Sequence, residues 1–230
     1  MGPTAARIAR QPLRIPIGAV TLDADLSLPT GATGLVLFAH GSGSSRFSPR
    51  NRHVAQRLGD AGLATVLADL LTAQEELVDD RTTQLRFDIG LLAARLVGAA
   101  DWLQTQPLTA ALPLALFGAS TGAAAALVAA AQRPQRIVAV VSRGGRPDLA
   151  GDALPAVQAP TLLIVGGNDV PVIALNRQAL NQLHAAKRMV IVPGATHLFE
   201  EPGALDVVAD EACDWFLRHL PGLQRLRGMG

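Results

Sequence analysis

The chain has 230 residues, of which 49% are hydrophobic, which predicts one domain with a well-buried core and excludes an intrinsically disordered protein. Its 20 lysines and arginines nearly balance its 19 aspartates and glutamates, so the net charge of +1 creates no overall field that would attract nucleic acid or an anionic membrane. The single cysteine, Cys213, excludes a disulfide framework and a cysteine-based zinc site, and it favours a reducing compartment.

The ends of the chain carry few structural signals. Residues 1–16 alternate basic and small side chains without the apolar run of a signal peptide, and no later apolar run is long enough to cross a bilayer. We therefore expect a cytoplasmic protein that binds neither membranes nor nucleic acid. One domain is expected over residues 1–230, with flexible ends at 1–12 and 221–230.

The predicted elements begin with an antiparallel hairpin. Residues 15–28 alternate apolar and polar side chains around Gly18, which is typical of a hairpin near the edge of a sheet. After it, continuous apolar runs alternate with helical patterns. Strands are predicted over residues 34–39, 64–70, 112–117, 137–141, 160–165 and 188–192. Helices are predicted over residues 49–61, 85–104, 121–132, 172–183 and 204–219, and the acidic stretch 72–83 is expected to be a surface excursion.

The repeated alternation of strands and helices predicts an α/β fold. Parallel strands require crossover helices, so the sheet should be mostly parallel and twisted, with the hairpin at its N-terminal end and helices on both faces. The segment between the strand ending at Val141 and the strand beginning at Pro160 is too short for a cap domain. We expect an open site beyond the carboxyl ends of the strands.

The sequence Gly118-Ala-Ser120-Thr-Gly122 lies where a predicted strand turns into a predicted helix. Glycine two residues before and two residues after the serine removes side chains that would collide as the strand and the helix fold back on each other. Such a turn holds the Ser120 hydroxyl clear of the backbone and directs the first N–H groups of the helix toward the group that it attacks. The pattern predicts a nucleophilic serine; the alternative is an ordinary loop of small residues.

Two further reactive side chains follow predicted strands. Asp169 comes after the strand at 160–165 and His197 after the strand at 188–192, so both should lie at the same edge of the sheet as Ser120. A serine hydroxyl is a poor nucleophile until a base removes its proton, and an acceptor must orient that base. The order serine, carboxylate, histidine along the chain matches one known arrangement of catalytic triads.

Four segments together carry a family resemblance. They are His-Gly-Ser-Gly at 40–43, the serine turn at 118–122, Gly-Gly-Asn-Asp at 166–169 and Gly-Ala-Thr-His at 194–197. Through them the chain resembles the α/β-hydrolases and, among these, the small dienelactone-hydrolase-like esterases and thioesterases. The resemblance extends from the hairpin to the last helix. It implies an α/β-hydrolase fold without a large cap domain and a reaction that needs neither a metal nor a cofactor.

The resemblance also implies roles for individual residues. Ser120 would be the nucleophile, His197 the general base and then the general acid, and Asp169 the group that orients the imidazole. Ser120 stands where the dienelactone hydrolases proper carry a cysteine, a departure that puts lactone specificity in question and leaves acyl chemistry intact.

The same resemblance implies an oxyanion hole. The N–H of Thr121, the residue after the nucleophile, would act with a second N–H from the loop after the strand at 34–39. In that loop Ser42 is the expected donor and Gly43 the alternative. His40 is expected to brace the loop by hydrogen bonding rather than to transfer a proton.

Asp169 has a second interpretation. It could cap the helix that follows it, which is a common use of aspartate at that position. In that case Glu200 or Glu201 would be the acid of the triad.

Arginines are the main indication of the substrate. Arg46 follows the oxyanion loop and Arg143 follows the strand beside the nucleophile, so both could border the cleft and bind an anionic acyl group through the planar guanidinium. Arg86 and Arg146 are weaker candidates. In the alternative interpretation, Arg143 and Arg146 pair with nearby aspartates and brace a glycine-rich loop.

These observations predict a serine hydrolase that cleaves a carboxylic ester, thioester or lactone through an acyl-enzyme. The alternatives are an amidase or acyltransferase that uses the same residues, or a non-catalytic ligand-binding module that keeps the fold. The expected partners are a small-molecule acyl substrate, anionic if the arginines bind it, and a second copy of the chain in a homodimer.

Overall fold

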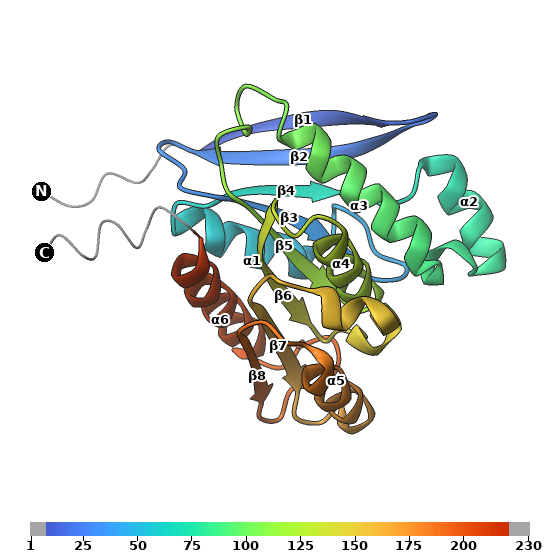
Figure 1. Cartoon of the computed structure of the whole chain (residues 1–230), viewed down its shortest axis with the longest axis vertical. Helices are drawn as coiled ribbons and strands as arrows, with labels where there is room; N and C mark the ends of the chain where they lie inside the picture. The colour runs from blue at the N-terminus through green and yellow to red at the C-terminus, as the bar shows by residue number, and fades with distance from the viewer. Residues whose placement is uncertain (1–7, 221–230) are drawn as a thin grey trace, which may run out of the picture.

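Eight strands form one sheet in the computed structural model, which describes residues 8–220. Their order across the sheet is β1-β2-β4-β3-β5-β6-β7-β8 (Figure 1). The strands are β1 Ile8–Ile17, β2 Val20–Pro29, β3 Leu35–Ala39, β4 Ala64–Ala68, β5 Leu114–Ala119, β6 Ile137–Arg143, β7 Thr161–Gly166 and β8 Lys187–Val192. β2 pairs antiparallel with β1 and β4, and the other pairs are parallel. The predicted mostly parallel sheet with an N-terminal hairpin is confirmed.

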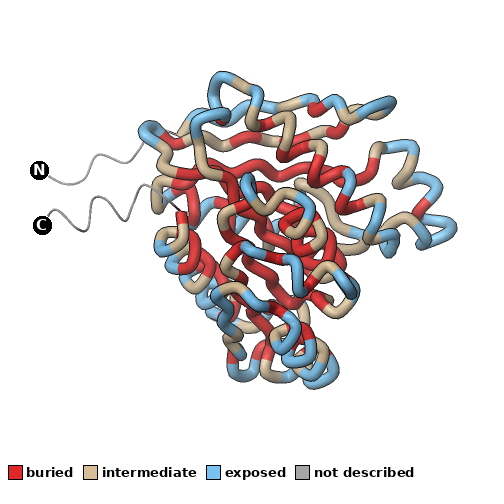
Figure 2. The backbone as a smooth tube through the Cα atoms, in the orientation of Figure 1, coloured by how far each residue is buried: buried red, intermediate tan, exposed pale blue. Residues whose placement is uncertain are grey.

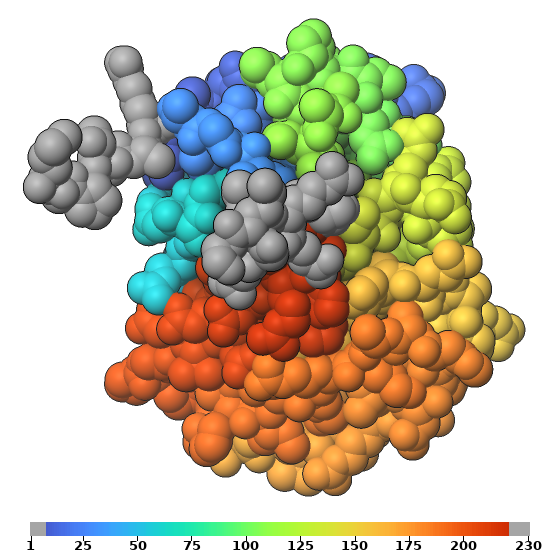
Figure 3. All heavy atoms as spheres, turned by 60° about the vertical axis from the view of Figure 1, so that its left-hand side comes forward, coloured from blue at the N-terminus to red at the C-terminus, as the bar shows by residue number. Residues whose placement is uncertain are grey.

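Helices cover both faces of this sheet (Figure 1). The α-helices are α1 Pro49–Asp60, α2 Ala73–Thr82, α3 Ile89–Leu103, α4 Thr121–Gln132, α5 Val170–Gln182 and α6 Ala204–His219, and the 3-10 helices are η1 Leu85–Phe87 and η2 Pro147–Ala156. One core cluster packs α3, α4 and α5 on the sheet, and a second packs α1 and α6 on the opposite face. Figure 3 shows α1 in cyan beside α6 in orange-red. Between β6 and β7 the chain forms only η2, so no cap domain is inserted there.

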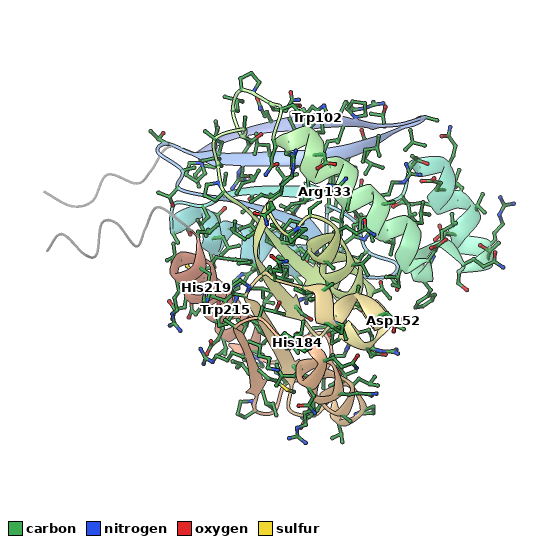
Figure 4. All side chains as sticks on the ribbon, viewed as in Figure 1. Trp102, Arg133, Asp152, His184, Trp215 and His219 are labelled. Carbon is green, nitrogen blue, oxygen red and sulfur yellow. The ribbon has the colours of Figure 1, made fainter. Side chains whose placement is uncertain are left out.

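The central strands are buried because helices cover both of their faces. Every residue of β3, β4, β5 and β7 is buried, and these strands form the red interior of Figure 2. Removing such apolar runs from water contributes about 25 cal/mol per Å² of apolar surface. At the end of α6, the indole N–H of Trp215 donates to the carbonyl of Pro160, and the Trp215 ring lies 4.3 Å from that of His219 (Figure 4). The packed sheet fixes the loops after β3, β5, β7 and β8.

The N-terminal hairpin is longer than the alternation of residues 15–28 predicts. β1 pairs with β2 from Ile8 opposite Pro29 to Ile17 opposite Val20. The flexible end expected over residues 1–12 is therefore wrong for residues 8–12, because their backbone is paired in the sheet. The remaining parts of both expected flexible ends, 1–7 and 221–230, lie outside the described residues.

The acidic stretch 72–83 lies at the surface, as expected, but most of it forms the helix α2, which was not predicted. Thr72 caps α2: its hydroxyl accepts from the N–H of Glu75 at 3.2 Å, and the Glu75 carboxylate accepts from the N–H of Thr72 at 2.7 Å. This reciprocal pair satisfies two N–H groups that would otherwise have no partner at the helix start. Threonine followed three residues later by glutamate is a sequence signal for a helix start. The helix was not predicted because its residues form no apolar stripe. Across residues 8–220, no helix combines the length and the apolar character required to cross a membrane.

Candidate active site

Ser120 occupies the turn between β5 and α4. Its φ of 51° and ψ of −121° lie in a region that residues with a side chain rarely adopt, so the turn is strained. The Ser120 N–H donates to the carbonyl of Arg143 at 3.3 Å, and the Ser120 carbonyl accepts from the N–H of Arg146 at 3.1 Å. The end of β6 and the loop after it therefore hold the strained turn in place from the side.

Close packing explains the two glycines of this turn. A Cβ on Gly118 would lie 2.4 Å from the backbone of α4, and a Cβ on Gly122 would lie 2.3 Å from the carbonyl oxygen of Ala39. Neither position has room for a methyl group. A Cβ on Gly41 would lie 2.8 Å from the Cβ of Ser120, so the loop after β3 passes directly beside the serine.

His197 and Asp169 form a hydrogen-bonded pair in the loops after β8 and β7. Because a carboxylate can only accept, the Nδ1–H of His197 donates to Oδ2 of Asp169, at 2.7 Å. In the neutral imidazole this leaves Nε2 unprotonated and able to accept a proton. The Asp169 side chain is 14% exposed and the His197 side chain 39% exposed, so the acceptor is enclosed while the base remains accessible.

The alternative acids make other contacts. Asp169 forms no side-chain capping bond with α5, whereas Glu200 pairs with Arg50 of α1 at 3.1 Å. The Glu201 carboxylate accepts from the N–H of Thr196 at 3.0 Å. Hydrogen bonding to the Thr196 side chain, together with the backbone N–H groups of Glu201 and Thr196, lowers the pKa of Glu201. The geometry therefore favours Asp169 as the partner of the imidazole. Glu201 instead braces the loop that carries His197.

Ser120 and His197 both lie against the end of β6. A Cβ on Gly144 would lie 2.9 Å from the carbonyl oxygen of His197 and 3.7 Å from its Cε1, and Gly144 directly follows Arg143, whose carbonyl accepts from Ser120. Within residues 8–220, the structure gives no hydrogen bond between the Ser120 hydroxyl and the His197 ring. Proton transfer between these two groups is therefore part of the proposal made below.

Ser42 and Thr121 lie together beside Ser120. Ser42 belongs to the loop after β3 and Thr121 is the first residue of α4, yet their hydroxyl oxygens are 3.1 Å apart. Thr121 is buried, and Gly43, with φ of 63°, turns the loop immediately after Ser42. The structure thus brings together the two residues expected to form an oxyanion hole.

His40 braces this loop from inside the protein. The N–H of Leu70 donates to its Nε2 at 3.0 Å, so the ring proton lies on Nδ1, which donates to the carbonyl of Gly41 at 3.0 Å. Burial lowers the pKa of His40, although the Gly41 hydrogen bond and the charge of Asp69 act in the opposite direction. The neutral ring therefore links the loop to the segment after β4, as expected from the sequence.

This brace predicts a pH-dependent stability. As the pH falls below about 6.5, the unfolded chain protonates His40 while the folded chain resists protonation, so the free energy of unfolding should decrease. Urea denaturation at a series of pH values measures the slope. His40→Gln should flatten the slope below about pH 6.5, and the matched control His184→Gln, at an exposed position labelled in Figure 4, should keep the wild-type slope. Equal slopes in wild type and His40→Gln would contradict the assignment.

A sequence model described as the dienelactone hydrolase family matches residues 22–225. The chain belongs to the dienelactone hydrolase family. A crystal structure of a dienelactone hydrolase from Anabaena variabilis is 63% identical, with a TM-score of 0.91, and the match covers 93% of this chain and 99% of that chain. The predicted α/β-hydrolase fold is confirmed.

Further proteins are similar to this chain in sequence or in fold. Two proteins from strains of Mycobacterium tuberculosis, which carry the provisional name phosphoribosyl transferase, are 56% identical over 210 residues. The match covers 91% of this chain and 46% of each of those proteins, so the chain spans about half the length of the curated relatives it matches. Est1E from Butyrivibrio proteoclasticus shares the fold at 16% identity and a TM-score of 0.76, over 90% of this chain and 98% of that chain.

In this member of the dienelactone hydrolase family, Arg46 and Arg143 make contacts that fit a bracing role. Arg46 forms an ion pair with Asp69, which follows β4. Arg143 is the last residue of β6 rather than a loop residue, is 7% exposed, and donates to Oδ1 of Asn51 on α1 at 3.3 Å. Burial, with the charge of Arg50 nearby, lowers the pKa of Arg143 to about 10.

The two weaker arginine candidates are also paired. Arg146 donates to both carboxylate oxygens of Asp148, at 2.9 and 2.7 Å, as the bracing interpretation expects. Arg86 binds Asp79 and Asp80 of α2. Arg46, Arg86 and Arg146 are therefore each held by aspartates. Among the described residues, Nε and Nη1 of the buried Arg143 have no hydrogen-bond partner.

Asn176 is a supporting residue that the sequence interpretation missed. It is fully buried on α5, and its Nδ2 donates to the carbonyls of Gly145 at 2.9 Å and Val172 at 2.8 Å. It therefore fixes the loop after β6 that packs beside Ser120 and His197. An asparagine between apolar residues of a predicted helix was the available signal.

Proposed function

We propose that this protein is a serine hydrolase that cleaves esters, thioesters or lactones of small molecules. Its family and the 63% identical dienelactone hydrolase support hydrolysis as the type of reaction. The observation that carries the proposal is the hydrogen bond from His197 to Asp169, in the loops beside the strained turn of Ser120. A partly buried acceptor on one ring nitrogen makes the other nitrogen a base, which is the arrangement that serine catalysis requires.

The proposed reaction has two acyl-transfer steps. Nε2 of His197 removes the Ser120 proton while Oγ attacks the carbonyl carbon, and the carbonyl oxygen becomes negatively charged. The N–H groups of Thr121 and Ser42 then donate to that oxygen, each worth about 3 kcal/mol of barrier. His197 passes the proton to the leaving alcohol or thiol, and water, activated by the same nitrogen, releases the acid.

This mechanism needs no metal or cofactor, because the side chains supply the nucleophile, the base and the hydrogen-bond donors. Within residues 8–220 no three histidine, cysteine, aspartate or glutamate side chains are grouped in a way that could hold a metal ion. The cytoplasmic location and the homodimer stay predictions.

Asp169→Asn tests the mechanism. We expect kcat/KM for a short-chain p-nitrophenyl ester to fall by about ten-thousandfold, because the amide favours the wrong imidazole tautomer while the geometry persists. Glu200→Gln is the matched control and should retain activity, because Glu200 contacts Arg50 instead of the imidazole. A large loss in Glu200→Gln with activity retained in Asp169→Asn would assign the triad acid to Glu200 and refute the proposed mechanism.

A further inference from the structure

A cavity of about 220 Å³ opens beside the oxyanion loop. Its walls are the loop at residues 40–45, part of α2, Arg86, Leu92 and Thr121. Ser42 and Thr121, the residues proposed to form the oxyanion hole, both line it. A group that occupies the cavity would therefore lie next to the carbonyl oxygen of a substrate bound as proposed above.

One wall of the cavity holds an arginine that is paired with two carboxylates. Asp79 is almost fully buried, accepts from the backbone N–H of Arg86 at 3.0 Å, and also pairs with its guanidinium, whose second pair is with Asp80 at 3.1 Å. A Cβ on Gly43 would lie 3.4 Å from Nη1 of Arg86, so the guanidinium reaches the oxyanion loop. Two carboxylates thus balance this arginine, and it adds no net positive charge to the cavity.

Glu76 is different from these paired groups. It lies on α2, is half-buried, and lines the cavity, yet within residues 8–220 the structure gives its carboxylate no hydrogen bond and no ion pair. Burial, followed by the charges of Asp69 and Asp80, raises the pKa of Glu76, although the charge of Arg46 acts in the opposite direction. A carboxylate in such surroundings is stabilised by a positive charge, and a ligand that supplies one would bind favourably.

The alternatives to a cationic ligand fit less well. An anionic acyl group was expected from Arg46 and Arg143, but neither guanidinium lines the cavity, and both make contacts elsewhere. A metal ion lacks a set of ligands, since Glu76 belongs to no group of three suitable side chains among residues 8–220. An organic cation needs only the single carboxylate and the space beside it.

We propose that the cavity binds a positively charged group of the substrate, with Glu76 as its counter-charge, so that the substrate is an ester or thioester with an ammonium group a few bonds from the reacting carbonyl. This inference rests on the proposed serine hydrolase function and adds the substrate class. Glu76 is then the residue that determines specificity for charge.

Matched ester pairs test this inference. One pair places the charge on the alcohol: acetylcholine against the uncharged isostere in which a tert-butyl group replaces the trimethylammonium. The other pair places the same two groups on the acyl chain of a p-nitrophenyl ester. In at least one pair, wild-type kcat/KM should favour the cation by about tenfold, and Glu76→Gln should remove most of that preference.

Two further variants sharpen the result. Glu76→Lys should reverse the preference. Asp152→Asn changes an exposed aspartate on η2, outside the cavity and labelled in Figure 4, and should keep the wild-type ratio. Equal rates within both pairs in the wild type, or a preference that survives Glu76→Gln, would overturn the inference.

A binding measurement separates this inference from the proposed function. Binding of both matched pairs to Ser120→Ala, measured by calorimetry, requires no hydrolysis, and in at least one pair the Kd of the cation should be about tenfold lower than that of its uncharged isostere. Equal Kd values within both pairs would refute the cation site even if neutral esters are hydrolysed. A cation preference in binding without hydrolysis of any ester by the wild type would refute the serine hydrolase and leave the cation site standing.

Discussion

Ser120→Ala is expected to lower kcat for a neutral short-chain ester by about a millionfold, because the remaining groups can only bind the substrate and polarise its carbonyl. The fold should persist, since alanine fits in the space of serine and the turn is held by backbone hydrogen bonds to Arg143 and Arg146. Stopped-flow or long-time spectrophotometric assays with p-nitrophenyl acetate measure the loss, and circular dichroism verifies the fold.

Ser27→Ala is the matched control for this substitution. Ser27 is half-buried on β2, away from the loops that carry the candidate triad, and its replacement should leave kcat within twofold or so of wild type. Labelling by a fluorophosphonate probe provides a second readout: wild type and Ser27→Ala should be labelled, and Ser120→Ala should not. Turnover by Ser120→Ala at near the wild-type rate would assign the reaction to another group, and an unlabelled wild type would favour a non-catalytic binding module.

Gly122→Ala is expected to lower the free energy of unfolding by about 4 kcal/mol or more. The new Cβ would lie 2.3 Å from the carbonyl oxygen of Ala39 and 2.5 Å from that of His40, both in the backbone, so α4 would have to move away from β3. This movement would also displace Thr121 from Ser42. Urea denaturation followed by circular dichroism measures the stability.

Gly59→Ala provides the comparison. Gly59 lies within α1, and a Cβ there meets only the end of the Ile8 side chain, at 3.6 Å, which is ordinary contact. Alanine favours a helix over glycine by about 1 kcal/mol, so this variant should be slightly more stable than wild type. Comparable stabilities of the Gly122→Ala and Gly59→Ala variants would show that the tight approach of α4 to β3 is not required.

The residues of the site that could be predicted from the sequence are those that directly follow a strand of the parallel sheet. Ser120, Asp169 and His197 each follow a continuous apolar run, and such runs can be placed in a parallel sheet without knowledge of tertiary contacts. The glycines at 118 and 122 likewise indicated a tight turn, because their spacing around Ser120 is visible in the local sequence. The pairing of Asp169 with His197 then followed from the common edge of β7 and β8.

The parts that could not be predicted depend on distant side-chain contacts. Arg143 donates to Asn51, 92 residues away in the chain, and no local pattern distinguishes that contact from a substrate-binding role. Arg46 is held by Asp69 in the same way. The helix α2 was missed because its apolar residues form no stripe, and its start is fixed by polar groups instead of by burial.

The position of α2 has a consequence for how this protein could acquire new substrates. The helix packs mainly against η1 and is joined to α3 by the ion pair of Glu75 and Arg95, so it contributes little to the core (Figure 1). It nevertheless supplies Glu76 to the cavity beside Ser42 and Thr121. Substitutions in this short helix can therefore change the side chains that line the cavity while the rest of the fold keeps its sequence. A library randomised at the exposed and cavity-lining positions of α2 is the direct way to search for altered substrate preference.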